Sequence, residues 1–461
     1  MSRTRTNDLG RDKVGPLLFR LALPAIFAQV VNALYNIVDR IYIGHLGADG
    51  DLALTGLGIC FPIITFISAL ASLAGQGGAP RAAIAMGEGD DHRANSILGN
   101  SVTLLLLFSV AATVILQIFK EPLLLAFGAT EATLGYALEY LTIYLYGSVF
   151  VLVTLGLNTY ISAQGFSTVS MATVLIGAAI NIVLDPVFIF LFGMGVKGAA
   201  LATVLAQAVS CLWVLRFLTS SRSKLRIRRS CLKLSGKLVA PIMGLGVSPF
   251  IMQATESLIS ISFNASLRDF GGDAAVGAMT ICSSVLMVMW LPTQGLAQGA
   301  TPIISFNYGA GHLDRVKETI RLLLISCGGY ILAFWVFAQL FPHALVSLFN
   351  NDPHLTALTV WALRIYIAGM CVFWIQMACQ QAFISLGQAK ISLFLALLRK
   401  VFLLVPLIFI LPNFFENKVF AVFLAEPIAD VTAALVCGAL FLLRIPKILK
   451  AREDALKNQS N

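Results

Sequence analysis

The chain has 461 residues, of which 58% are hydrophobic and only 12% are charged. A soluble globular domain carries about 25% charged residues, so the composition excludes that class and indicates a membrane protein. Transmembrane β-barrels are excluded too, because their strands alternate apolar and polar residues. The apolar residues here come in runs of about 20 or more, the length that an α-helix needs to cross a bilayer.

The basic N-terminus, residues 1–13, has no small-residue cleavage site, so we expect a cytoplasmic tail rather than a removed signal peptide. Polar or Gly/Pro breaks then divide the chain into apolar segments. We predict twelve transmembrane helices, at residues 14–43, 52–85, 94–119, 133–156, 157–192, 195–218, 238–267, 274–306, 316–341, 355–386, 391–411 and 419–443.

The placement of lysine and arginine orients these helices. With the N-terminus in the cytoplasm, the outer side holds only six of the 32 basic residues: Arg40, Lys120, Lys197, Arg268, Arg364 and Lys418. An even number of crossings returns the C-terminal tail, residues 446–461, to the cytoplasm. We therefore expect a multi-pass protein of the plasma (inner) membrane, and the net charge of +9 needs no nucleic acid partner.

The longest hydrophilic stretch between helices is basic, covers residues 220–237 and lies almost at the middle of the chain. We interpret it as a cytoplasmic linker between an N-terminal lobe, residues 14–219, and a C-terminal lobe, residues 238–445. A basic segment at a membrane surface also suits binding to anionic lipid or to another protein, and that alternative stays open.

The two lobes are internal repeats. Six residue pairs are separated by 222 positions, namely Gln76, Gly77, Pro80, Gly87, Gly89 and Arg93 with Gln298, Gly299, Pro302, Gly309, Gly311 and Arg315. Each half contains six predicted crossings, so equivalent helices start on the same side of the membrane and the repeats are parallel. This is the layout of a rocking transporter with a central cavity.

Polar residues inside apolar helices mark functional positions, because hydrocarbon makes them costly. Segment 14–43 places four of them on one helix face, with Tyr35 beside them: Gln29, Asn32, Asn36 and Asp39. The equivalent segment 238–267 carries a similar stripe of Gln253, Glu256, Ser260 and Asn264. Both helices are expected to turn a polar face toward a site.

Segment 157–192 contains Asn181 and Asp185, which are four residues apart and project together, followed by Pro186. The proline frees a backbone carbonyl one turn back. A carboxylate, an amide oxygen and a loosened backbone suit a proton or a hard cation such as Na⁺. In the second half Pro406 follows Val405, so the carboxylate has no counterpart there.

Each acidic residue also has a structural interpretation, which the sequence leaves open. Asp39 could be a helix-end residue that is paired with Arg40 or solvated. Asp185 could be a buried aspartate whose hydrogen bonds are satisfied, and Glu256 could be a polar residue that packs between helices. Two further acids in segment 419–443, Glu426 and Asp430, suit either a second polar patch or the cavity wall.

At these residues the chain resembles the multidrug and toxic compound extrusion (MATE) family, in particular its DinF-like and MepA-like bacterial branch. The resemblance rests on LALPAIFAQVVNALYNIVDRIYIGHLG, on NIVLDPVF and on GxKGAALAT from Gly195 to Thr203, and it covers nearly the whole chain. It implies a V-shaped pair of six-helix lobes in an all-α membrane protein. It also implies a secondary active multidrug efflux antiporter that exchanges H⁺ or Na⁺ for an exported drug by alternating access.

The resemblance further implies roles for particular residues. The cation-coupling site, including any Na⁺ site, falls on Asp39, Asn181, Asp185 and Thr203. The substrate pocket and the bending helix of the family correspond to Pro24, Tyr35 and Asn158, and an acidic position of the family corresponds to Glu256. We expect all four to bind the substrate or to gate its path. To this group we add four polar residues of the two stripes: Gln29, Asn32, Asn36 and Gln253. An aspartate found in the NorM-like branch is absent from segment 355–386, which instead offers Gln376, Gln380 and Gln381.

Other classes fit less well. No GxxxxGK[ST] or HExxH motif is present, and the five histidines fall in loops or at helix ends, so an ATPase or another enzyme is not expected. We expect no cofactor, a monomer, and lipophilic or cationic amphipathic drugs and membrane lipids as partners.

The competing interpretation is a lipid-linked oligosaccharide or other lipid flippase of the same superfamily, whose cavity is typically lined with arginines. We expect the embedded charges here to be acidic, with basic side chains placed toward helix ends: Arg81, Arg364, Arg399 and Lys400. That distribution favours a cationic substrate.

Overall fold

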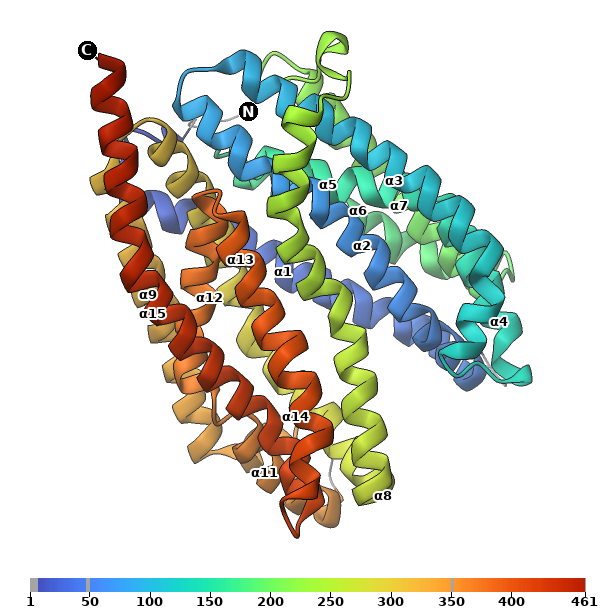
Figure 1. Ribbon diagram of the computed structural model, residues 1–461. Helices are drawn as coiled ribbons and strands as arrows, with labels where there is room; N and C mark the ends of the chain where they lie inside the picture. Colours follow the sequence, from blue (N-terminus) through green and yellow to red (C-terminus); the bar gives the residue numbers. More distant parts are fainter. Residues whose placement is uncertain (1–6, 47–49, 350–351, 461) are drawn as a thin grey trace. The chain divides into compact units, whose positions relative to one another are not determined.

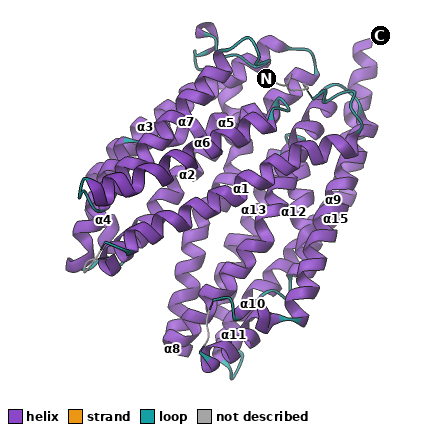
Figure 2. Cartoon of the chain, turned by 180° about the vertical axis from the view of Figure 1, so that it is seen from behind, coloured by secondary structure: helices purple, strands orange, loops and turns teal. Residues whose placement is uncertain are grey.

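The computed structural model describes residues 7–46, 50–349 and 352–460. Every regular element in these ranges is a helix (Figure 1; Figure 2). The first half contains α1 (Val14–Gly44), α2 (Gly50–Gly87), α3 (Asp91–Ala126), α4 (Glu131–Tyr146), α5 (Ser148–Ala163), α6 (Ser167–Pro186), η2 (Val187–Leu191), α7 (Val196–Thr219) and η3 (Arg229–Cys231).

The second half begins within the long helix α8. Its elements are α8 (Gly236–Gly309), α9 (Leu313–Leu340), α10 (Pro342–Val346), α11 (Pro353–Tyr366), α12 (Met370–Ser385), α13 (Ala389–Leu397), η4 (Leu398–Leu404), α14 (Val405–Ile410), η5 (Leu411–Asn413) and α15 (Lys418–Ser460). The predicted all-α class is confirmed for the described residues.

Nine helices in the described ranges are long and apolar enough to cross a membrane, or eleven when each of two bent pairs counts as one span. The 74-residue helix α8 breaks at Gly272, whose φ of 66° lies in the left-handed region that glycine favours. This break falls between the predicted segments 238–267 and 274–306. Large apolar side chains such as Val183, Leu435 and Leu442 are exposed on the protein surface, as lipid-facing residues must be.

The predicted boundary between the fourth and fifth helices, at residues 156 and 157, is wrong. Helices α4 and α5 form one broken span bent by 57°, with Gly147 between them. The chain instead turns after Ala163, where Gly165 has a φ of 87°. The hydropathy pattern misses the bend because no charged residue or proline accompanies Gly147, and it misses the turn because Gln164 and Gly165 interrupt the apolar run only briefly.

The internal repeat is visible in the backbone. Left-handed glycines occur in pairs that are 222 positions apart: Gly89 with Gly311, and Gly165 with Gly387. The second bent pair, α11 with α12, is bent by 49° next to Gly369, which lies 222 positions after Gly147. Equivalent turns and equivalent bends therefore follow the register that the sequence repeat predicts.

The described chain forms two compact units, and two helices contribute to both. Unit 1 contains Phe27–Ala254 and the described residues before Leu9, while unit 2 contains Leu9–Ile26 and the described residues from Thr255 onward. The first half of α1 thus packs in unit 2 and the first part of α8 packs in unit 1. Each unit exchanges the start of one long helix with the other.

Glycines allow the exchanged segments to pack closely. In unit 1, a Cβ added to Gly246 of α8 would overlap the Leu73 backbone of α2, and one added to Gly77 would lie 2.8 Å from the Gly246 nitrogen. In unit 2, a Cβ on Gly299 would lie 2.6 Å from the Ala22 nitrogen of α1. Gly77 and Gly299 are repeat equivalents, so one small-residue contact is used twice.

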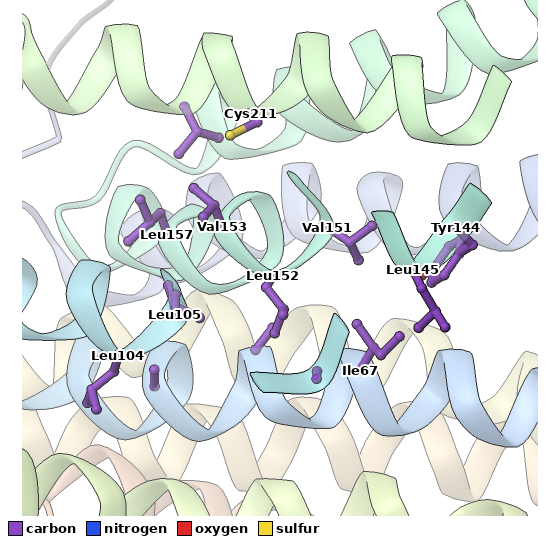
Figure 3. Close-up of a cluster of buried hydrophobic side chains, with 14 of the residues drawn as sticks. Ile67, Leu104, Leu105, Tyr144, Leu145, Val151, Leu152, Val153, Leu157 and Cys211 are labelled. Carbon is purple, nitrogen blue, oxygen red and sulfur yellow. The ribbon is translucent and has the colours of Figure 1, made fainter. Parts of the chain in front are cut away.

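Unit 1 is built around helices α2, α3, α5 and α7, which pack side by side. Figure 3 shows part of its core, where apolar side chains from α2, α3, α4 and α5 meet around Ile67, Leu105, Leu145 and Leu152. The basic linker is also fixed to this unit. The side-chain oxygens of Asn95, Asn100 and Gln164 accept hydrogen bonds from linker backbone amides at 2.7–2.9 Å.

The glycine contact predicts opposite effects of the same substitution at two positions. Alanine is a better helix former than glycine by about 1 kcal/mol, but at Gly246 its Cβ meets the Leu73 backbone. Gly246→Ala should lower the thermal unfolding midpoint of the purified protein, because overpacking costs about 1–3 kcal/mol. Gly58→Ala is the matched control, since nothing lies within 4 Å of an added Cβ there. Equal midpoints for the two variants would contradict this packing.

Candidate functional site

Three helices of unit 1 bring four of the predicted coupling residues together. Asn181 and Asp185 lie one turn apart on α6, and the Asn181 Nδ2 donates to Asp185 Oδ1 at 3.2 Å and to Thr203 Oγ1 of α7 at 3.3 Å. Asp39 comes from α1, and its carboxyl group interacts directly with that of Asp185. The helical spacing of four residues on α6 sets the first contact, and the packing of α1, α6 and α7 sets the others.

This cluster is buried and incompletely hydrogen-bonded. Asp39 is 8% exposed, Asn181 2% and Asp185 0%. One side-chain oxygen of each, Asp39 Oδ1, Asn181 Oδ1 and Asp185 Oδ2, has no hydrogen-bond partner. Buried polar atoms without partners are rare and costly, so the cluster offers three unused oxygen acceptors to an incoming ligand.

Two tyrosines complete the surroundings. Tyr35 of α1 is close enough to interact electrostatically with both aspartates. Tyr140 of α4 is close enough to interact electrostatically with Asp39. Sequence reasoning included Tyr35 and missed Tyr140, although the four-residue spacing of Tyr140 and Tyr144 within an apolar run was a usable signal.

The backbone next to the cluster is irregular. Pro186 ends α6 and is followed by the π-helical segment η2. Proline cannot donate to the helix ladder, and π-helical turns are frequent at functional sites. On α7, one turn beyond Thr203, Gln207 has a buried oxygen without a partner. This position was also missed from the sequence.

The remaining predicted pocket residues are more dispersed. Pro24 lies inside α1, in the part that belongs to unit 2, and farther along α1 Asn36 donates to the Asn32 carbonyl at 2.6 Å. Asn158 of α5 donates to the Ser170 carbonyl at 3.2 Å, which leaves its own oxygen unpaired. Gln29 of α1 lies in the part of that helix that belongs to unit 1, and its side chain is half-buried.

The predicted polar stripe of segment 238–267 is divided between the two units. Gln253 belongs to unit 1, where it donates to Ser72 Oγ at 2.8 Å. Glu256, three residues later, belongs to unit 2. On the same face of α8, Gln253 therefore makes a hydrogen bond within unit 1, whereas Glu256 makes an ion pair within unit 2.

Unit 2 contains a buried ion network that the sequence analysis did not predict. Arg399 of η4 is 5% exposed and pairs at 2.7 Å with both Glu426 and Asp430 of α15. Its guanidinium also lies 4.4 Å from the centre of the Phe373 ring, an attractive cation–π distance. Glu426 and Asp430 thus form a second polar patch, one of the two alternatives left open.

Lys400 extends this network to α8. Its side chain is 8% exposed and forms an ion pair with Glu256, whose side chain is 59% exposed. The expectation that Arg399 and Lys400 lie toward helix ends, leaving only acidic embedded charges, is wrong. Both lie in the middle of the span Ala389–Asn413, where partners on other helices neutralise them, and a scan of single helices cannot see those partners.

The glutamines of α12 do not replace the missing aspartate with a second open oxygen cluster. Gln376 donates to Gln380 at 3.5 Å and keeps one buried oxygen unpaired, whereas Gln381 donates to Thr301 at 2.7 Å. Among the described residues, no group of three or more His, Cys, Asp or Glu could hold a metal ion. Any cation in unit 1 would therefore need amide or hydroxyl oxygens besides the two aspartates.

Comparison with known proteins supplies the family. The MatE family model matches residues 24–187 and 249–410. The chain is 23% identical over 425 residues to the multidrug export protein MepA of Staphylococcus haemolyticus, covering 92% of this chain and 93% of that protein. Two MATE crystal structures, in the bent and the straight conformation, match with TM-scores of 0.90 and 0.89 at 24% and 25% identity, covering 97% of this chain and 100% of each of theirs.

The ion network predicts a large loss of stability when its central base is removed. Arg399→Met leaves Glu426 and Asp430 as buried, uncompensated charges, which costs about 3–5 kcal/mol. The thermal unfolding midpoint should fall sharply, and the triple change Arg399→Met, Glu426→Gln and Asp430→Asn should recover most of it. Arg268→Met, which breaks an exposed pair with Asp273, is the control and should change stability little. Wild-type stability of Arg399→Met would disprove the network.

Proposed function

The chain belongs to the MatE family of multidrug export transporters, and on this premise we propose that it is a secondary active antiporter that exports lipophilic or cationic amphipathic compounds in exchange for H⁺ or Na⁺. The family consists of transporters, not enzymes, and the chain is a multi-pass membrane protein. The observation that carries the proposal is the set of three buried, unpartnered oxygens of Asp39, Asn181 and Asp185.

The coupling ion binds in unit 1. Two interacting aspartates at near-zero exposure repel each other when both are ionised, so one added positive charge stabilises the pair strongly. A proton does this by bridging or neutralising one carboxylate. A Na⁺ ion does it by taking oxygens from the aspartates, from Asn181 and from Thr203, all hard ligands.

Ion binding changes the conformation through α1, which carries Asp39 in unit 1 and Pro24 in its unit 2 part. A proline inside a helix removes a ladder hydrogen bond and provides a place to bend. The solved MATE structures include one described as bent and one described as straight. We propose that neutralising Asp39 favours a bend near Pro24, which narrows the pocket lined by Tyr35, Asn36 and Asn158 and expels the drug.

The drug makes further contacts with the polar stripe of α1, which includes Gln29 and Asn32, and with α8, where Gln253 and Glu256 gate or bind it. Both termini face the cytoplasm, the lobes comprise residues 14–219 and 238–445, and the protein acts as a monomer. These assignments rest on the basic-residue distribution and the family resemblance.

A lipid flippase is the second candidate, because Arg399 and Lys400 place basic groups inside unit 2. The two bases are matched by three carboxylates, those of Glu256, Glu426 and Asp430. An arginine-lined pyrophosphate site would need basic groups without such partners. The surplus of acid therefore favours export of a cation over flipping of a phosphorylated lipid.

Ion-coupled export predicts that drug efflux follows an ion gradient. Cells that express the protein should accumulate less ethidium than vector controls, and the difference should vanish when ion gradients are collapsed. Proteoliposomes with a proton gradient and a Na⁺ gradient imposed separately then identify the ion. Efflux that persists without either gradient while ATP is present would refute antiport.

The oxygen cluster predicts the phenotype of conservative changes at the two aspartates. Asp185→Asn and Asp39→Asn keep the side-chain shape but cannot gain or lose a proton or bind Na⁺ with a full charge, so gradient-driven efflux should be abolished. Asp39→Asn should also bind drug more weakly, because it mimics the ion-loaded state. Asp51→Asn, an exposed change at the start of α2, is the control. Undiminished efflux by Asp185→Asn would show that this residue is only structural.

A further inference from the structure

The two side chains of the Lys400–Glu256 ion pair differ in their exposure. The Glu256 side chain is 59% exposed, whereas that of Lys400 is 8% exposed. The two residues come from different helices of unit 2, α8 and η4. A ligand that approaches this pair therefore reaches the carboxylate before it reaches the ammonium group.

Two further carboxylates, those of Glu426 and Asp430, lie near enough to Lys400 to interact with it electrostatically. Glu426 and Asp430 each use one carboxylate oxygen on Arg399. Their second oxygens, Glu426 Oε2 and Asp430 Oδ2, are buried and have no hydrogen-bond partner. The ammonium group therefore has acceptors available when it leaves Glu256.

The charge balance of the network selects the sign of the ligand. Three carboxylates face two bases, which leaves one negative charge in excess when all five groups are ionised. One added cation neutralises that excess, whereas an added anion increases it. The network is thus better suited to a positively charged ligand than to a phosphate or a carboxylate.

From this geometry we propose that Lys400 is a tethered competitor for the cationic substrate. In the unloaded protein its ammonium group occupies Glu256. A lipophilic organic cation displaces Lys400 from Glu256, and the ammonium group turns back to the free oxygens of Glu426 and Asp430. No buried charge loses its counterion during this exchange, which keeps its energetic cost low.

The competition has a consequence for specificity. A neutral or anionic compound gains nothing at Glu256 and leaves Lys400 in place. A cation must replace an ion pair that already exists, so only one with enough additional apolar contact binds well. Lys400 thereby raises the threshold for binding and disfavours small inorganic cations. This inference rests on the proposed export of organic cations and adds the residue that sets the selectivity.

The experiment measures equilibrium binding of ethidium to the purified detergent-solubilised full chain, by fluorescence and without any ion gradient. Lys400→Met removes the competitor and should tighten ethidium binding about tenfold, the effect of losing one charge-assisted hydrogen bond. Lys400→Arg keeps the positive charge and should bind as the wild type does. Lys390→Met, an exposed lysine at the start of α13, is the matched control and should have no effect.

A double variant tests whether the effect passes through Glu256. Glu256→Gln should weaken ethidium binding, and adding Lys400→Met to it should give no further gain, because the two residues act on the same contact. Thermal unfolding of each variant confirms that it is folded; the Glu256 side chain is 59% exposed, so the loss of Lys400 does not leave a fully buried carboxylate without a partner.

Several outcomes would overturn the proposal. Unchanged or weaker ethidium binding by folded Lys400→Met excludes competition, as does an equal gain from Lys400→Met in the presence of Glu256→Gln. Loss of binding of the anionic dye fluorescein in Lys400→Met would instead identify an anion site. Failure of the antiport proposal is distinguishable, because it shows in wild-type efflux that ignores ion gradients, whereas this test compares binding between variants at equilibrium.

Discussion

The structure depends on one constraint, which is that a charged or polar group within a transmembrane helix must find compensation inside the protein. Unit 2 meets this constraint with ion pairs, in which Arg399 and Lys400 are paired with three carboxylates. In unit 1, among the residues that the structure describes, neither aspartate of the cluster forms an ion pair with a lysine or arginine, and one oxygen of each lacks a hydrogen-bond partner. The bases of unit 2 thus have counterions inside the protein, whereas the acids of unit 1 keep unused acceptor oxygens.

The two arrangements occupy related places in the repeat. On α7, Thr203 and Gln207 are one turn apart, and on α15 Glu426 and Asp430 have the same spacing, each 223 positions later. In unit 1 one acid of the cluster, Asp185, lies on α6, which packs against α7, and the other, Asp39, lies on α1. In unit 2 the acids lie on α15 and the base lies on the facing segment η4. The two repeats therefore have similar backbones but place their charged residues on different helices, so the two units differ in their chemistry.

Sequence patterns predicted the parts of this site that depend on one helix. The spacing of Asn181 and Asp185 and the stripe that ends at Asp39 follow from helical periodicity alone. Tyr140, Gln207 and the partners of Arg399 depend on how separate helices pack, which no single segment encodes. The bend beside Gly147 was missed because no charged residue or proline marks it; Val204 of α7 packs so closely there that a Cβ on Gly147 would overlap it. The repeat register was the long-range signal that the sequence contained, and the two bends, beside Gly147 and Gly369, follow its spacing of 222 positions.

The exchange of helix segments connects the two charge clusters to conformational change. Helices α1 and α8 each belong to both units, with the crossings at Ile26 to Phe27 and at Ala254 to Thr255. Both helices are continuous through these crossings, so each one has residues that pack in either unit. Asp39 lies about three helical turns beyond the first crossing, and Glu256 lies beside the second. Each helix thus carries a functional acid on one side of its crossing and a glycine-packed segment that anchors it on the other. Under the proposed ion coupling, a change of charge at Asp39 acts on the packing of α1 in unit 1, and a change of charge at Glu256 acts on the packing of α8 in unit 2.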